Sequence, residues 1–289
     1  MKTILFSRPG TCRTPGEAEQ LLQAAESRGF DYALNREFAE EVRALTGRAI
    51  PDSMTYGQRT GRQPHDSVMV CYGGDGTLLE AVHRLDGEQI PVAGINSGHL
   101  GFLAAAAKEG VDTLFDAIAG GRLDVEPRHM LEACIGSTQT LHALNEVAVQ
   151  HFGAAMISIA IHIDGTLAAT CDGSGLIVST PTGSTAYSLS AGGPVVAPSC
   201  RCMVVAPLAP HNLTMRPLVI PDTSVVTLEI DPRNRPMTIS ADNRTLEGDA
   251  PVTLEIRRSQ RVVFLATPHN NSFYDTLRNK MMWGVDIRK

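Results

Sequence analysis

Three glycines surround one carboxylate in the segment Gly73–Thr77, which reads Gly-Gly-Asp-Gly-Thr. The segment follows the apolar run 68–72 and precedes a run with apolar residues at helical spacing. Glycine lets the backbone approach a ligand closely, and the start of a helix offers free N–H groups to an anion. The segment therefore suits phosphoryl transfer to a hydroxyl, with Asp75 accepting the hydroxyl proton. A tight turn with a solvated aspartate is the alternative that these residues leave open.

A second segment, 179–194, is rich in hydroxyl groups and reads Ser-Thr-Pro-Thr-Gly-Ser-Thr-Ala-Tyr-Ser-Leu-Ser-Ala-Gly-Gly-Pro. Its hydroxyl side chains stand at positions 179, 180, 182, 184, 185, 187, 188 and 190. We expect Ser184 to cap a short helix over 184–191, and the hydroxyls as a group to suit a polar ligand with ribose hydroxyls and an amide. A surface loop whose turns satisfy their own hydroxyls is the alternative.

A polar pair, Asn145 and Glu146, interrupts the apolar run 144–149. Adjacent side chains of a strand point to opposite faces, so one of the two would be buried. A buried polar side chain needs a hydrogen-bond partner or a ligand. The pair is therefore a candidate for ligand binding, although an edge strand with an exposed glutamate explains it equally well.

Strand and helix patterns alternate in the first third of the chain. Strands are expected over 3–6, 68–72 and 92–95, helices over 16–28, 38–45, 77–85 and 111–119, and a loop over 50–66. Such alternation is typical of a parallel sheet with helices on its faces, where ligands bind at the carboxyl ends of strands. The glycine segment and a second loop, 96–101, both follow such strands. We therefore expect an α/β domain over residues 1–122.

Short apolar runs separated by turn residues follow from about residue 126. They cover 131–135, 144–149, 156–163, 175–180, 202–206, 218–220, 224–230, 236–240, 251–255 and 261–265, with hairpin turns at 164–165, 232–234 and 248–249. This pattern predicts an all-β, sandwich-like domain over 123–267. Helical spacing returns over 272–282, and we expect residues 268–289 to complete the first domain, with Trp283 anchoring the helix.

The composition is that of a soluble globular protein, with 43% hydrophobic and 19% charged residues among 289. The net charge of −6 argues against a nucleic-acid partner or an anionic membrane surface. None of the six cysteines forms a Cys-x-x-Cys pair, which disfavours zinc and thioredoxin-like sites. Reduced thiols and an apolar N-terminal run too short for a signal peptide indicate a cytoplasmic protein.

The combined segments resemble the NAD kinase family over nearly the whole chain. The residues that carry the resemblance are Gly73–Thr77, Gly94–Leu103, Asn145-Glu146, Ser179–Pro194 and Pro210–Ile220, and the tail Asp275–Asp286 looks like that of NAD kinases from the Bacteroidetes. Diacylglycerol and sphingosine kinases share the glycine segment alone. The hydroxyl-rich segment together with the Asn-Glu pair is far more specific.

The resemblance implies an NAD kinase/diacylglycerol kinase-like fold with a dinucleotide-binding second domain. It implies transfer of the ATP γ-phosphate to the 2′-hydroxyl of the adenosine ribose of NAD, yielding NADP, with Mg²⁺ or another divalent cation as cofactor. The implied partners are NAD, ATP and further copies of the chain in a homodimer or homotetramer. The sequence leaves open the donor, ATP or polyphosphate, the use of NADH, and feedback by the product.

The resemblance also assigns site residues. Asp75 is the expected catalytic base, and no side chain is assigned as a metal ligand. The expected nucleotide contacts are Gly73, Gly74, Gly76, Thr77, Asn96, Phe102, Asn145, Glu146, Asp172, Ser174, Thr182, Thr185, Ala186, Tyr187, Ser190, Ala209 and Arg244. His99, in the second loop, is a further candidate for phosphate contact.

Two positions depart from the family pattern. Ser174 stands where the family usually has an aspartate, so either Ser174 replaces it as a neutral group or Asp172 reaches over from the same face of a strand. Arg244 ends a segment in which the family often has Asp-Gly-Gln, and it could reach a phosphate. Two other functions stay open: a lipid or sugar kinase with the same glycine loop, and a non-catalytic NAD(P)-binding regulator.

Overall fold

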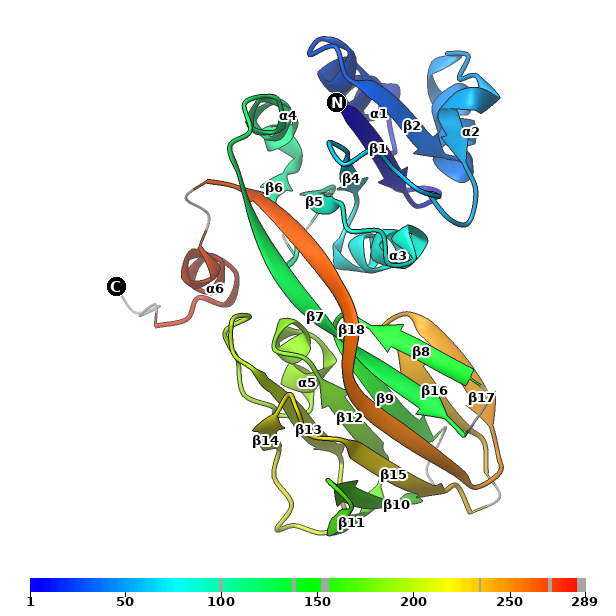
Figure 1. The fold of residues 1–289 in the computed structure, drawn as a ribbon, viewed down its shortest axis with the longest axis vertical. Coiled ribbons are helices and arrows are strands. Elements are labelled where there is room, and N and C mark those ends of the chain that lie inside the picture. The colour runs from blue at the N-terminus through cyan, green and yellow to red at the C-terminus, as the bar shows by residue number, and fades with distance from the viewer. Residues whose placement is uncertain (99–100, 137–138, 152–155, 234, 270–271, 285–289) are drawn as a thin grey trace. The chain divides into compact units, whose positions relative to one another are not determined.

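The computed structural model describes residues 1–98, 101–136, 139–151, 156–233, 235–269 and 272–284. The chain divides into two compact units. The first consists of Met1–Pro127 and Val263–Lys289, and the second of Arg128–Val262. Two long strands, β7 (Leu123–Ile135) and β18 (Val252–Pro268), carry the chain from the first unit into the second and back (Figure 1).

The first unit is built on a parallel sheet. Its strands are β1 (Lys2–Ser7), β2 (Asp31–Asn35), β3 (Thr55–Tyr56), β4 (Val68–Tyr72), β5 (Pro91–Asn96) and β6 (Ala106–Ala107). The order β3-β2-β1-β4-β5 is parallel throughout, and β6 and the last part of β18 also pair with β5 in parallel. The carboxyl ends of β4 and β5 therefore lie next to each other.

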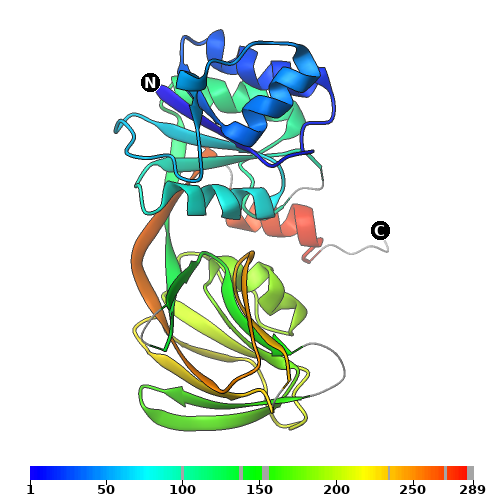
Figure 2. The ribbon, with the colours of Figure 1, turned by 90° about the vertical axis from the view of Figure 1, so that its right-hand side faces the viewer.

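Helices cover both faces of this sheet (Figures 1 and 2). They are α1 (Pro15–Glu26), α2 (Arg36–Thr46), α3 (Asp75–Leu85) and α4 (Val111–Ala119), with α6 (Phe273–Met281) added from the C-terminal segment. On one face Leu22, Phe38 and Leu114 from α1, α2 and α4 share a buried core with Leu5 and Val70. On the other face α3 lies against the sheet, where Leu78 contacts Gly94 of β5. This arrangement confirms the predicted α/β unit.

The second unit consists of two antiparallel sheets. One contains β10 (Ile157–Ile163), β11 (Thr166–Gly173), β15 (Val226–Asp231), β18, β7 and β8 (Gln139–Ala143); the other contains β9 (Glu146–His151), β12 (Gly175–Ser179), β13 (Cys202–Leu208), β14 (Leu218–Pro221), β16 (Met237–Ala241) and β17 (Arg244–Gly248). Ile159 and Leu254 of the first sheet share a buried core with Leu176, Val205 and Ile239 of the second. The predicted all-β, sandwich-like unit is therefore confirmed.

Several local predictions were exact and others were wrong. Strand 68–72 and helix 111–119 have the predicted bounds. Strands β2, β8, β11 and β17 were missed, the loop 50–66 contains a 3-10 helix (Asp52–Met54) and β3, and the two runs 251–255 and 261–265 belong to the single strand β18. The missed strands are short or carry polar residues, which weakens an apolar signal.

The predicted turns and the closing helix also need correction. The turn at 164–165 joins the paired strands β10 and β11 and is a hairpin. Residues 232–233 and 248–249 instead connect strands of different sheets, and Asn234 lies outside the described residues. Trp283 is 63% exposed and does not anchor α6, whose buried residue is Leu277. Among the described residues, no helix combines the length and apolar character needed to cross a membrane.

Candidate functional site

The glycine loop connects the end of β4 to the start of α3. Gly73 has φ +152°, and a Cβ there would stand 2.3 Å from the Thr77 Oγ1 atom, so the loop needs glycine at this position. The Gly73 N–H donates to the Ile95 carbonyl at 2.9 Å. Helix α3 begins directly at Asp75, and its first backbone N–H groups therefore belong to the loop itself.

A second loop, which follows β5, holds the Asp75 carboxylate through its backbone. The Phe102 N–H donates to Oδ2 at 2.7 Å and the Leu103 N–H donates to Oδ1 at 3.1 Å. A Cβ on Gly101 would stand 1.9 Å from Oδ1, so only glycine allows this approach. The two loops predicted at neighbouring strand ends thus meet at one carboxylate.

Other predicted residues surround this carboxylate or support the loops. Thr77 and Asn96 are buried, and the Asn96 amide oxygen accepts the Gly98 N–H at 3.0 Å. The Arg8 guanidinium lies beside Gly76, 3.3 Å from the position of an added Cβ, and pairs with Glu80 at 2.6 Å. His99 lies outside the described residues.

In the second unit the polar pair and the hydroxyl-rich segment are joined through their backbones. The Thr180 N–H donates to the Asn145 carbonyl at 2.8 Å, and the Thr180 hydroxyl donates to the Leu144 carbonyl at 2.6 Å. A Cβ on Gly183 would stand 2.2 Å from the Asn145 carbonyl oxygen. The structure therefore brings two segments far apart in sequence into direct contact.

Asp242 fixes the same segment from the other side. Its carboxylate accepts the backbone N–H groups of Leu144, Asn145 and Glu146 at 2.7, 2.8 and 3.2 Å. Asp242 stands in the two-residue turn between β16 and β17 with φ +54°, a conformation that aspartate tolerates better than most residues. Three backbone donors on one carboxylate make the 144–146 turn rigid.

Asn145 and Glu146 each offer an atom without a protein partner. The Asn145 Oδ1 and Glu146 Oε2 atoms are buried and accept no hydrogen bond from the residues that the structure describes. Burial, together with the nearby Asp242 charge, raises the pKa of Glu146 from 4.5 to about 8, against a smaller lowering by the Tyr187 N–H. Orphaned buried polar atoms of this kind mark a place for a ligand.

Part of the hydroxyl-rich segment serves the fold instead of a ligand. The Ser179 hydroxyl donates to the Thr180 carbonyl, and Ser184 both donates to and accepts from the backbone of Val196. The prediction that Ser184 caps a helix is therefore wrong. The expected helix is split into a 3-10 turn (Thr182–Thr185) and a short helix, α5 (Tyr187–Ser190).

The remaining residues of the segment differ in their surroundings. Tyr187 and Ser190 are exposed, and the Tyr187 hydroxyl donates to the Gln150 side chain at 2.9 Å. The Thr185 hydroxyl donates to the Thr182 carbonyl, and the Ala186 N–H donates to the Gly183 carbonyl. Tyr187 and Ser190 are thus the hydroxyls of the set most accessible to a ligand.

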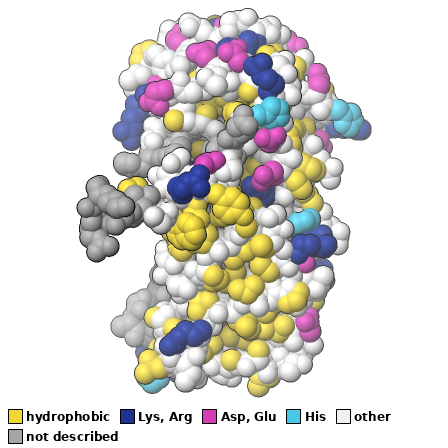
Figure 3. Space-filling view, turned by 90° about the vertical axis from the view of Figure 1, so that its left-hand side faces the viewer, with side chains coloured by type: hydrophobic (Ala, Val, Ile, Leu, Met, Phe, Trp, Pro, Cys, Tyr) yellow, Lys and Arg dark blue, Asp and Glu magenta, His cyan; other side chains and the backbone are white. Residues whose placement is uncertain are grey.

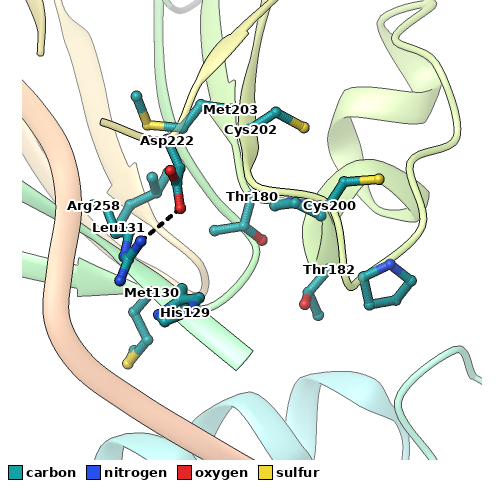
Figure 4. Close-up of a pocket in the computed structure, with 12 residues that line it drawn as sticks. His129, Met130, Leu131, Thr180, Thr182, Cys200, Cys202, Met203, Asp222 and Arg258 are labelled. Carbon is teal, nitrogen blue, oxygen red and sulfur yellow. Dashed lines mark hydrogen bonds and ion pairs between the residues drawn. The ribbon is translucent and has the colours of Figure 1, made fainter. Parts of the chain in front are cut away.

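Thr182 lines a small cavity of about 20 Å³ in the second unit (Figure 4). The ion pair between Arg258 and Asp222, at 2.7 Å, lies on one side of this cavity, and Cys200 and Thr182 lie on the other. This volume corresponds to about one water molecule.

The structure corrects the geometry assumed for Ser174 and Asp172. Asp172 lies on β11, whereas Ser174 stands at the corner before β12, which belongs to the other sheet. The two side chains therefore do not share a strand face. Asp172 is paired with Arg233 at 2.6 Å.

The last two predicted contacts lie at strand ends. Ala209 follows β13 with φ +41°, and its carbonyl lies against Gly173. Arg244 begins β17, where its guanidinium donates to the His142 carbonyl at 3.4 Å.

Fold and site together define a class of protein: a kinase in which a parallel α/β unit carries a glycine loop with one carboxylate, joined to an antiparallel β unit. Comparison with family models narrows this class. The model of the ATP-NAD kinase N-terminal domain matches residues 11–123, and that of the ATP-NAD kinase C-terminal domain matches residues 144–267. The chain belongs to the NAD kinase family.

Individual relatives agree with this assignment. An NAD kinase of Bacteroides fragilis is 33% identical over 100% of both chains, and one of Porphyromonas gingivalis is 39% identical over 78% of each. The resemblance of the tail to the Bacteroidetes enzymes is thereby confirmed. Among solved structures, yeast NADH kinase in complex with NADH has the same fold, with a TM-score of 0.85 and 21% identity over 100% of this chain and 89% of that one.

Two residues that shape the site were not predicted in these roles. Gly101 was read only as part of a motif, and Asp242 only as part of the segment that departs from the family pattern. A glycine beside a motif aspartate is a usable signal for close backbone approach. The role of Asp242 depends on contacts with a distant segment, which have no local signal.

Proposed function

We propose that this protein transfers the γ-phosphoryl group of ATP to the 2′-hydroxyl of the adenosine ribose of NAD, producing NADP and ADP. The observation that carries the proposal is the Asp75 carboxylate, held by the Phe102 and Leu103 N–H groups at the mouth of a glycine loop. A fixed carboxylate beside an anion-binding loop is what a phosphoryl transfer to a hydroxyl requires.

Asp75 acts as the base in this proposal. A carboxylate has about four lone-pair sites, so the two N–H bonds leave room for the hydroxyl of the acceptor. The hydroxyl proton passes to Asp75 as the oxygen bonds to the γ-phosphorus. The bond from that phosphorus to the β–γ bridging oxygen breaks, and ADP leaves with the electron pair.

Backbone groups of the glycine loop receive the donor phosphates. The N–H groups of Gly73 and Thr77 already donate to the carbonyls of Ile95 and Gly74, so these two residues shape the loop. Gly74 and Gly76, at the start of α3, offer their N–H groups to the phosphates, where the helix dipole favours an anion. A divalent cation, Mg²⁺ in the first instance, would further compensate the phosphate charge. Such an ion is commonly held by substrate phosphates and one or two carboxylates, and Asp75 is the carboxylate of this loop that would contribute.

Asn145 and Glu146 bind the dinucleotide in this proposal. Their buried Oδ1 and Oε2 atoms have no hydrogen-bond partner among the described residues and can form hydrogen bonds with the ligand. Because its pKa is raised to about 8, the Glu146 carboxyl is mostly protonated at neutral pH and can donate as well as accept a hydrogen bond. Ribose hydroxyls and the adenine edge offer matching groups.

The remaining predicted contact residues are assigned roles from their positions in the structure. Tyr187 and Ser190 are exposed and bind the nicotinamide–ribose portion, with Thr182, Thr185, Ala186 and Ala209 shaping the surrounding backbone. Ser174 acts as the neutral replacement for the usual aspartate, because Asp172 is engaged by Arg233. Asn96 supports the second loop, and Arg244 contacts a phosphate. We further propose that the protein acts in the cytoplasm as a homo-oligomer.

The test is an assay of the purified protein with ATP, Mg²⁺ and NAD, with NADP followed through an NADP-specific dehydrogenase. We expect NADP formation that depends on NAD and on a divalent cation. Parallel reactions replace ATP by polyphosphate, NAD by NADH, and NAD by diacylglycerol. If the wild-type protein forms no NADP with any donor or metal, the proposal is rejected.

A further inference from the structure

Lys280 lies near the catalytic loops although it comes from the far end of the chain. It stands in the last turn of α6, and its ammonium group lies 5.1 Å from the centre of the Phe102 ring. The backbone N–H of the same Phe102 donates to Asp75. One aromatic residue of the second loop therefore connects the ammonium of Lys280 to the carboxylate of Asp75.

The surroundings of Lys280 are unusual for a lysine. The side chain is half-buried, and burial lowers the pKa of its ammonium, whereas the charge of Asp75 acts in the opposite direction. Within the described residues, its ammonium forms no ion pair and no hydrogen bond. A cation that loses water without gaining a carboxylate partner carries a cost that an anionic ligand would offset.

Two nearby arginines show the contrast. Arg8, beside Gly76, is already paired with Glu80 at 2.6 Å. Arg278, two residues before Lys280 and exposed on α6, is paired with Asp275. Lys280 differs from both because, within the described residues, no carboxylate lies within ion-pair distance of its ammonium.

From this geometry we propose that the Lys280 ammonium contacts the γ-phosphoryl group of the bound nucleotide and stays with it during transfer to the acceptor. The proposal rests on the function proposed above and adds a catalytic residue to it. A cation at the transferring group offsets the charge that spreads over its three oxygens. The Phe102 ring lies under the ammonium, and this cation–π contact keeps the ammonium in place.

The decisive comparison uses Lys280→Met, which keeps an unbranched side chain of similar length and removes the charge. We expect kcat to fall about 10²-fold with little change in the KM for NAD. We also expect the affinity for Mg²⁺-ATP, measured calorimetrically, to fall about tenfold, whereas that for Mg²⁺-ADP stays unchanged. ADP lacks the γ-phosphoryl group, so the difference isolates the proposed contact.

Matched variants test whether the effects of Lys280→Met come from the proposed contact. Arg278→Met removes one charge from the same helix and should leave kcat, the KM for NAD and both nucleotide affinities as in the wild type. Lys280→Arg should recover much of the ATP affinity, and Lys280→Gln provides a second neutral variant if the methionine variant unfolds. An equal loss of ATP and ADP affinity, or an unchanged kcat, would overturn the assignment.

The two proposals can fail separately. If the wild-type protein makes no NADP, the acceptor assignment is wrong. The ATP and ADP titrations of wild type and Lys280→Met still decide whether Lys280 contacts the γ-phosphoryl group. If NADP is formed and the titrations show no difference between the nucleotides, the Lys280 proposal alone is rejected.

Discussion

Gly183 lies so close to Asn145 that an added Cβ would stand 2.2 Å from the Asn145 carbonyl oxygen and 2.4 Å from its carbonyl carbon. Backbone atoms cannot retreat as a flexible side chain can. The contact therefore fixes the hydroxyl-rich segment against the Asn-Glu pair, and it explains why a glycine stands between two threonine-rich turns.

Gly183→Ala should separate these two segments. Overpacking of this kind costs about 1–3 kcal/mol, so we expect a Tm lower by several degrees and weaker NAD binding. Gly248→Ala is the matched control, because no atom lies within 4 Å of its added Cβ. Scanning calorimetry and NAD titration of both variants check the prediction, and equal Tm values would contradict it.

Asp75→Asn should remove the proton acceptor and leave the dinucleotide bound. An asparagine also places an NH₂ group against the N–H of Phe102 or Leu103. We expect kcat to fall by about 10²–10⁴-fold, with the dissociation constant for NAD nearly unchanged. Asp86→Asn, at the other end of α3, is the control and should keep full activity. Full turnover in the Asp75 variant would remove the assigned base.

Glu146 makes stability depend on pH in a predictable direction. Its pKa is raised from 4.5 to about 8 in the folded protein, so between these values the folded state keeps a proton that the unfolded state releases. The free energy of unfolding therefore falls as pH rises through this window, and the loss is complete above the folded pKa. At low pH both states are protonated and the effect vanishes.

Glu146→Gln removes this titration. We expect the variant to gain Tm relative to the wild type as the pH rises from about 5 to about 8, and the gain to level off above that range. Melting curves of both proteins across this range provide the measurement. A difference in Tm that is independent of pH would mean that the carboxyl titrates normally.

Asp242→Ala should loosen the turn that presents Asn145 and Glu146. Three backbone N–H groups lose a charged acceptor, each bond to a charged group being worth about 1.5–3 kcal/mol at most, so we expect at least tenfold weaker NAD binding and a lower Tm. Asp249→Ala, in an exposed connection nearby, should change neither quantity. Unaltered NAD affinity in the Asp242 variant would show that the turn holds its shape without it.

The edge strand β14 is our candidate for self-association. The face of the second unit in Figure 3 carries many hydrophobic side chains, and on β14 Leu218 and Val219 are each about half exposed. Edge strands with exposed apolar residues pair readily with other chains. We expect Val219→Lys to shift sedimentation toward smaller species, while Tyr274→Lys, at an exposed apolar residue of helix α6, should not. An unchanged distribution would exclude this strand from the interface.

The sequence predicted the parts of the fold that depend on local patterns. The loop Gly73–Thr77, strand β4 and helix α4 follow from apolar spacing and glycine placement, and the α/β and all-β units follow from the order of such patterns. The sheets into which strands enter are set by distant partners. For that reason turns between different sheets were taken for hairpins. Strands β8 and β11 were missed because their polar residues weaken the apolar signal.

In the candidate site, too, only the features with a local sequence pattern were predictable. The glycine loop, the Asn-Glu pair and the hydroxyl-rich segment could be recognised one by one. Their hydrogen-bond partners could not, because the Ser184–Val196 and Asp242–Asn145 contacts join residues that share no local pattern. The hydroxyls of Ser179, Thr180, Ser184 and Thr185 bond to backbone carbonyls of the fold or of neighbouring turns.

The path of β18 also bears on how the protein is made. Phe264 and Leu265 pair with β5, and α6 follows them, so the first unit requires the last part of the chain. The second unit is continuous from Arg128 to Val262. It can therefore fold before residues 263–289 are made, whereas the first unit is completed only once they are present. A chain truncated before residue 263 thus lacks Lys280 and leaves β5 without its partner β18. Such an exposed strand edge would make the truncated chain sensitive to proteolysis.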